Sequence, residues 1–120
     1  MLCLVATGTV MTLAVQSFTL AWTHSIEKVR WEEDYRVAGT RLELVEARVQ
    51  GSAAGMEPAP GARFHHGWWR YAPALRWHAE LRLTRSPYAD DYEICTAGRC
   101  QSLAALVPQR EGITRVFACG

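Results

Sequence analysis

The stretch Phe18-Thr-Leu-Ala-Trp-Thr-His24 alternates apolar and polar residues, and so does Trp31-Glu-Glu-Asp-Tyr-Arg-Val37 shortly after it. Successive side chains of a β-strand point to opposite faces of the sheet, so this period of two is typical of half-buried strands. The intervening residues 26–30 have the length of a hairpin connection. We therefore predict an antiparallel hairpin with His24 and Trp31 at the roots of its loop.

Short strands separated by turn-forming residues are predicted along most of the chain. Beyond the hairpin, the strand-like segments are 68–71, 81–83, 92–95 and 101–103. Seven to nine short antiparallel strands in one domain predict an all-β fold, either a β-sandwich or an open barrel. We assign residues 1–107 to this single β domain and residues 108–120 to a C-terminal strand or tail.

The segment 40–49 is compatible with two structures. Thr40 and Glu43 resemble the capping box of a helix, with Leu42 and apolar residues after it at helical spacing. A strand also fits, because a one-residue slip of the kind that a β-bulge produces would turn both apolar sets inward. The β-rich surroundings favour the strand, whose inward residues would be Leu42, Leu44, Val45, Ala47 and Val49.

The first 26 residues contain no Asp, Glu, Lys or Arg. A signal peptide needs a basic start, an unbroken apolar run and a small-residue cleavage site, and the sequence to Val15 fits this pattern poorly. The apolar run is also too interrupted for a transmembrane helix. We expect two short buried strands joined by a turn at Gly8, with any leader lying upstream.

Composition places the chain among globular proteins and narrows its partners. It has 120 residues, of which 49% are hydrophobic and 21% are charged, so one folded domain is expected. The formal net charge of +1 argues against nucleic-acid binding, which requires a clear basic excess. The sequence indicates no cofactor.

Two of the four cysteines are spaced for a disulfide across a tight turn. Cys95 and Cys100 bracket Thr-Ala-Gly-Arg, and a turn at Ala97-Gly98 would place them opposite each other in a hairpin. A structural disulfide requires an oxidising compartment, so we expect a periplasmic or otherwise extracytoplasmic location, with membrane association left open. Cys3 and Cys119 can pair only if the two termini meet.

A recognition site is predicted around the loop of the hairpin. Tryptophans that accompany a few fixed polar groups are typical of ligand pockets and of protein-contact hot spots. The glycine-rich segment 51–61 would join this site if it folds over the hairpin, and Lys28 with backbone amides would meet a small anionic group. The candidate binding residues are Trp22, His24, Ser25, Glu27, Lys28, Trp31, Glu32, Gly55, Met56 and Glu57.

Two alternative functions remain open at this point. A small hydrolase or metal-dependent enzyme would use His24 with Glu27 or Glu32, but neighbouring strand residues face opposite ways, so His24 and Ser25 are poorly placed to act together. The other histidines (His65, His66 and His78) show no metal-ligand spacing. A purely structural adaptor would present a flat apolar patch around Trp68-Trp69 and no pocket beside His24. We favour a non-enzymatic binding module.

The sequence resembles a bacterial domain-of-unknown-function family, number 1850. The matching order and spacing extend over about residues 2–107, and the segments that carry them are Phe18–Lys28, Trp31–Asp34, Gly55-Met-Glu-Pro58, Gly61-Ala62, Gly67-Trp-Trp69, Cys95–Cys100 and Leu103–Leu106. The resemblance implies a small exported protein that is accessory to a TAXI-type TRAP system for uptake of organic acids. The implied partners are the transporter membrane subunit and its periplasmic binding protein.

Overall fold

The computed structural model describes residues 1–24, 28–51 and 59–120, which form twelve β-strands and one short 3-10 helix. The elements in chain order are β1 (Leu2–Ala6), β2 (Thr9–Leu13), β3 (Ser17–Thr23), β4 (Arg30–Ala38), β5 (Arg41–Gln50), β6 (Arg63–His65), β7 (Trp68–Tyr71), β8 (Trp77–His78), β9 (Leu81–Arg85), β10 (Glu93–Thr96), β11 (Arg99–Ser102), η1 (Leu103–Ala105) and β12 (Gly112–Ala118).

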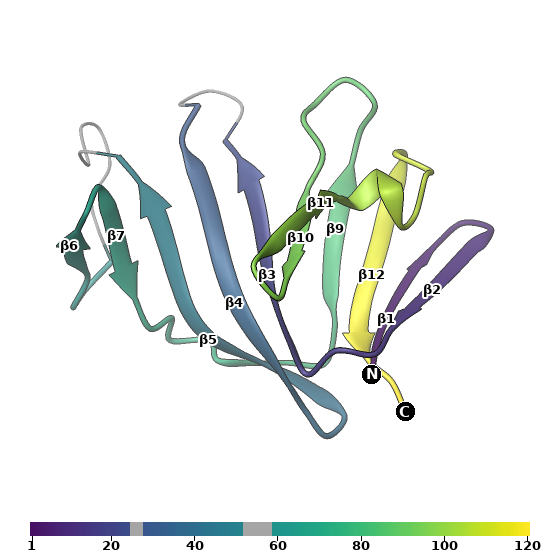
Figure 1. Cartoon of the computed structure of the whole chain (residues 1–120), viewed down its shortest axis with the longest axis horizontal. Coiled ribbons are helices and arrows are strands. Elements are labelled where there is room, and N and C mark those ends of the chain that lie inside the picture. Colours follow the sequence, from purple (N-terminus) through teal and green to yellow (C-terminus); the bar gives the residue numbers. More distant parts are fainter. Residues whose placement is uncertain (25–27, 52–58) are drawn as a thin grey trace.

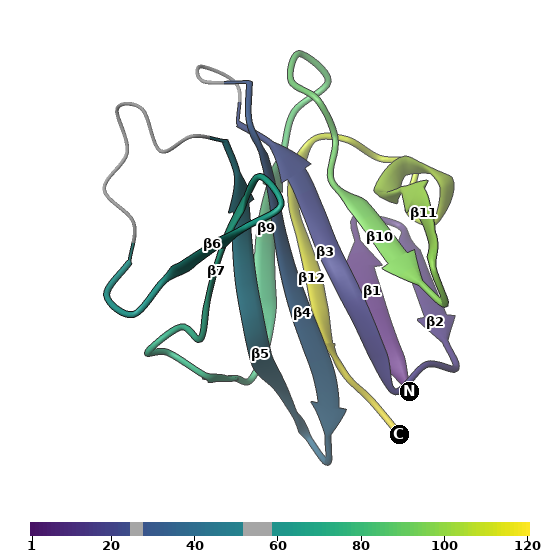
Figure 2. The ribbon, with the colours of Figure 1, turned by 60° about the vertical axis from the view of Figure 1, so that its left-hand side comes forward.

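The strands form two antiparallel sheets that pack as a sandwich (Figures 1 and 2). The smaller sheet has the order β2-β1-β12-β9, and the larger has the order β11-β10-β3-β4-β5-β7-β6, with β8 paired to β5. The predicted all-β class is confirmed, and of its two forms the molecule is a sandwich rather than a barrel. The predicted strand number is too low, because strands as short as β6 and β8 show no period-two pattern.

The core lies between the two sheets. Leu2, Leu4 and Val116 contribute from the smaller sheet, and Leu20 and Ile94 from the larger, all nearly or fully buried. The 3-10 helix η1 adds Leu103 to the same core. Among the described residues no helix has the length and apolar character that a membrane crossing requires.

The hairpin predicted at 18–37 is the centre of the larger sheet. β3 and β4 pair in register from Ser17 with Arg36 to Thr23 with Arg30, which sets Trp22 opposite Trp31. Phe18 is buried on the inner face of this hairpin, as alternation predicts.

The predicted bulge in β5 is also confirmed. The pairing with β4 shifts by one residue, so that Asp34 faces Glu46 while Tyr35 faces Leu44. Val45 is the extra residue, and it is 49% exposed rather than buried as predicted. A bulge residue has no partner across the ladder and turns away from the packed face. The other predicted inward residues of β5 are buried: Leu42, Leu44, Ala47 and Val49.

Both ends of the chain are strands of the smaller sheet. β1 and β2 form a hairpin around Gly8, whose φ of 76° favours glycine, as predicted for the N-terminal segment. β12 pairs with β1 on one side and with β9 on the other, so residues 112–118 are an interior strand rather than a tail. The two termini lie close together (Figure 1). A disulfide between Cys3 and Cys119 joins them.

Candidate functional site

A row of aromatic side chains crosses the inner face of the larger sheet. Trp22 on β3 faces Trp31 on β4, Trp31 faces Val49 on β5, Val49 faces Trp69 on β7, and Trp69 faces Phe64 on β6. The rings of Trp22 and Trp31 are stacked with centroids 6.1 Å apart, and those of Phe64 and Trp69 meet edge to face at 5.1 Å. The row follows from alternation on five adjacent strands that share one register.

The predicted hairpin loop begins at this row. His24 and Lys28 close the loop through two backbone hydrogen bonds, from His24 N–H to the Val29 carbonyl and from Lys28 N–H to the His24 carbonyl, each 2.9 Å long. Both side chains are exposed, and Lys28 has a left-handed backbone with φ of 59°. The other candidates in the two loops, namely Ser25, Glu27, Gly55, Met56 and Glu57, lie outside the described residues.

Trp22 and His24 also line a cavity of about 240 Å³ with Asp90, Asp91 and Tyr92. A structural adaptor does not require a pocket at this place. Trp68 and Trp69 do not form one apolar patch, because consecutive strand residues face opposite sides: Trp69 joins the aromatic row and Trp68 pairs with Gln50 and His65.

Glu32, a predicted binding residue, lies on the opposite face of the sheet from Trp22 and Trp31. Its carboxylate accepts hydrogen bonds of 2.7 Å from both Arg30 and Arg48. Arg48 also donates to Asp34 at 2.7 Å. The structure therefore assigns Glu32 to an outer-face ion-pair network and separates it from the tryptophans.

This outer-face network makes the stability of the fold depend on pH. Burial raises the pKa of Glu32, but hydrogen bonds from Arg30 and Arg48 outweigh it, and the pKa lies below its ordinary 4.5. Burial acts in the same way on Asp34, where hydrogen bonds from Arg48 and Thr19 hold the pKa below 3.8.

We expect the free energy of unfolding to fall as the pH drops below about 5. A carboxyl whose folded pKa is lowered stabilises the fold above its unfolded pKa, and this contribution is lost as pH falls through the folded pKa. Urea denaturation between about pH 7 and pH 2 measures the effect. In Arg48→Met the loss of stability toward acid should be shallower, and an unchanged slope would contradict this assignment.

Glu33 lies on the inner face beside the aromatic row. It pairs with Leu20 and Ala47 in the next row of the sheet, and it accepts a 2.8 Å hydrogen bond from the Tyr35 hydroxyl. The pocket that contains it has a volume of about 320 Å³, and edge strand β9 forms part of its wall. Sequence reasoning omitted Glu33 from the binding residues, although alternation had placed it on one face with Trp31 and Tyr35.

The negative charge of Glu33 acts on the tyrosines around it. Burial first, and then the nearby Glu33 carboxylate, raises the pKa of Tyr35 far above its usual value. The same two causes raise the pKa of Tyr71. Burial also raises the pKa of Tyr92, with smaller contributions from Asp91 and Glu33. These tyrosines stay protonated and can donate hydrogen bonds.

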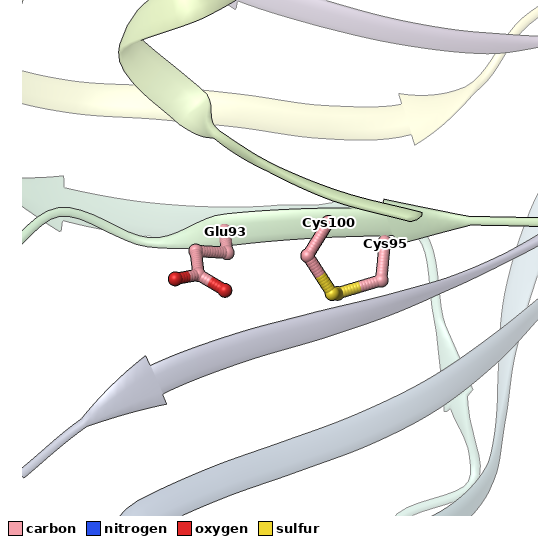
Figure 3. Close-up of side chains that lie close together, drawn as sticks. All are labelled: Glu93, Cys95 and Cys100. Carbon is pink, nitrogen blue, oxygen red and sulfur yellow. A yellow bond between two sulfur atoms is a disulfide. The ribbon is translucent and has the colours of Figure 1, made fainter. Parts of the chain in front are cut away.

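The predicted Cys95–Cys100 disulfide is present across the β10–β11 hairpin. Ligand atoms of Glu93, Cys95 and Cys100 lie within 4.8 Å of one another (Figure 3), the one such group among the described residues. Because both sulfur atoms are in the disulfide, neither is a thiolate that could bind a metal ion. The group is therefore a structural cross-link beside a carboxylate.

Taken together, the fold and the site define a disulfide-linked β-sandwich domain with an aromatic inner face and a carboxylate pocket. Residues 18–103 match the family described as "Domain of unknown function (DUF1850)". The chain belongs to this family, as the sequence resemblance predicts. Comparison with curated proteins and with solved structures gives no match.

Proposed function

We propose that the protein is a non-enzymatic, extracytoplasmic recognition module. The observation that supports this most directly is the aromatic row of Trp22, Trp31, Trp69 and Phe64, which reaches the same strand ends as the hairpin loop. Tryptophan and other aromatic side chains carry much of the binding energy at interfaces and in ligand pockets. The two disulfides support an oxidising compartment.

The module acts as an accessory of a TAXI-type TRAP uptake system for organic acids. This association comes from the family resemblance, and it implies the transporter membrane subunit or its periplasmic binding protein as the partner. Lys28 is the only lysine in the chain, and its exposed ammonium lies at the hairpin loop beside the aromatic row. A carboxylate of the partner or of its solute would be attracted to that charge.

Affinity capture from the native cell envelope tests the proposal. The tagged protein is expected to retain the transporter membrane subunit or its binding protein, and a His24→Ala/Lys28→Ala variant is expected to lose at least about tenfold of that recovery. Both side chains are exposed, so the variant should unfold at the same temperature as the wild type.

Arg99→Ala serves as the matched control. Arg99 is an exposed basic residue on β11, at the far edge of the larger sheet from the aromatic row. Its removal should leave recovery unchanged. If the wild type retains neither transport component, or if the loop variant retains as much as the control, the proposed function is wrong.

A further inference from the structure

Glu33 differs from the other acidic residues on the strands in its charge partners. Each of the others forms an ion pair with at least one arginine: Glu32, Asp34, Glu43, Glu46 and Glu93. Within the described part of the chain, Glu33 has no such partner, and its hydrogen bond comes from the neutral Tyr35 hydroxyl. The segments 25–27 and 52–58 contain no lysine or arginine that could supply one.

A half-buried carboxylate without a cation is unfavourable for folding. Transfer of a charge out of water costs free energy that a paired cation normally offsets. The sequence supplies twelve arginines and pairs them with the neighbouring acids, yet it leaves this inner-face carboxylate with a single neutral donor. Such a local conflict with stability is typical of binding sites.

The walls around Glu33 are aromatic. Trp22, Tyr35 and Tyr92 line the pocket with it, and the rings of Trp22 and Tyr92 are 6.0 Å apart at an interplanar angle of 56°. Aromatic faces carry negative electrostatic potential and attract ammonium groups, most strongly where water is excluded. A carboxylate beside several such rings therefore favours cations over anions.

The remaining charges of the pocket do not offset Glu33. Arg82 and Glu80 both line it, on the side of β9. Glu80 accepts a 2.6 Å hydrogen bond from Arg115 and lies 3.8 Å from Arg82, so the charges on this wall largely balance each other. Glu33 is left as the unbalanced charge on the opposite wall.

We propose that the pocket between the inner face of the larger sheet and edge strand β9 binds an organic cation, an alkylammonium or quaternary ammonium group, with Glu33 as counter-ion and Trp22, Tyr35 and Tyr92 around it. The pocket volume of about 320 Å³ suits a small molecule. This proposal rests on the proposed function, because it names a ligand class for the same recognition face.

Titration with small probes tests the assignment. Tetramethylammonium chloride and butylammonium chloride are the cationic probes, and sodium butyrate is the anion of matched chain length. We expect saturable changes in tryptophan fluorescence with both cations, because Trp22 lines the pocket, and at least about tenfold weaker binding of butyrate. Calorimetry should give the same order of affinities.

Three variants separate the charge from the rings. Glu33→Gln should weaken butylammonium binding about tenfold, whereas Glu46→Gln, an acid on the outer face, should leave it unchanged. Tyr92→Phe should bind nearly as well as the wild type, and Tyr92→Leu about tenfold less tightly, because the ring is lost. Circular dichroism establishes that each variant is folded.

The assignment is overturned if no cationic probe binds, if butyrate binds as tightly as butylammonium, or if Glu33→Gln binds as well as the wild type. These outcomes are distinct from failure of the proposed function, which envelope capture measures through His24 and Lys28. A protein that retains its transport partner but ignores cations would reject only the pocket assignment.

Discussion

Replacement of Cys3 and Cys119 by serine is expected to lower the free energy of unfolding by about 4–5 kcal/mol. Their disulfide closes a loop with a sequence separation of 116 residues, and the stabilisation from a cross-link grows with the length of the loop it closes. It also holds the pair of β1 and β12, in which Leu2 faces Ala118. Such a loss is a large fraction of the total stability of a small domain. Urea denaturation of the double variant measures it.

The second disulfide provides the matched control. Cys95 and Cys100 are separated by only five positions, so the same loop-closure argument gives about 2 kcal/mol for their double replacement by serine. The Cys3/Cys119 variant should therefore unfold at clearly lower urea. Equal losses in the two double variants would show that loop length does not govern the stabilisation.

Asp91→Ala is expected to destabilise the fold by about 3–5 kcal/mol, because it leaves the charge of Arg85 buried without a counter-ion. The Arg85 side chain is 0% exposed and that of Asp91 is 7% exposed. The guanidinium donates to both carboxylate oxygens, at 3.0 and 2.8 Å, and also to the Thr114 hydroxyl at 3.1 Å. Equilibrium denaturation of the variant against the wild type measures the loss.

A double variant shows whether the loss comes from the orphaned charge. Arg85→Met with Asp91→Ala removes both members of the pair, and it should be more stable than Asp91→Ala alone, since no buried charge then remains unpaired. If the second substitution adds a further loss instead, the interaction of Arg85 with Thr114 and its packing matter more than its charge.

The candidate site shows how far alternation can lead and where it stops. Period-two spacing separates Trp31 and Glu33 from Glu32, because neighbouring strand residues face opposite ways. The sequence interpretation chose Glu32 on account of its closeness to Lys28 along the chain, yet Glu32 lies among Arg30 and Arg48 on the outer face. The pattern contained the signal for Glu33, but only the ion pairs of the folded sheet show that it lacks an arginine partner.

Local pattern was sufficient for the hairpin at 18–37, the slip within β5 and the Cys95–Cys100 cross-link, because each depends on residues that are close in sequence. Strand periodicity and turn spacing express such contacts directly.

The junction of the termini, the interior position of β12 and the Glu33 pocket were visible only in the tertiary structure. Each joins segments that are far apart in the chain, and their meeting depends on how two sheets bury their apolar faces against each other. Many strand orders satisfy the same periodicity, so spacing along the chain does not choose among them.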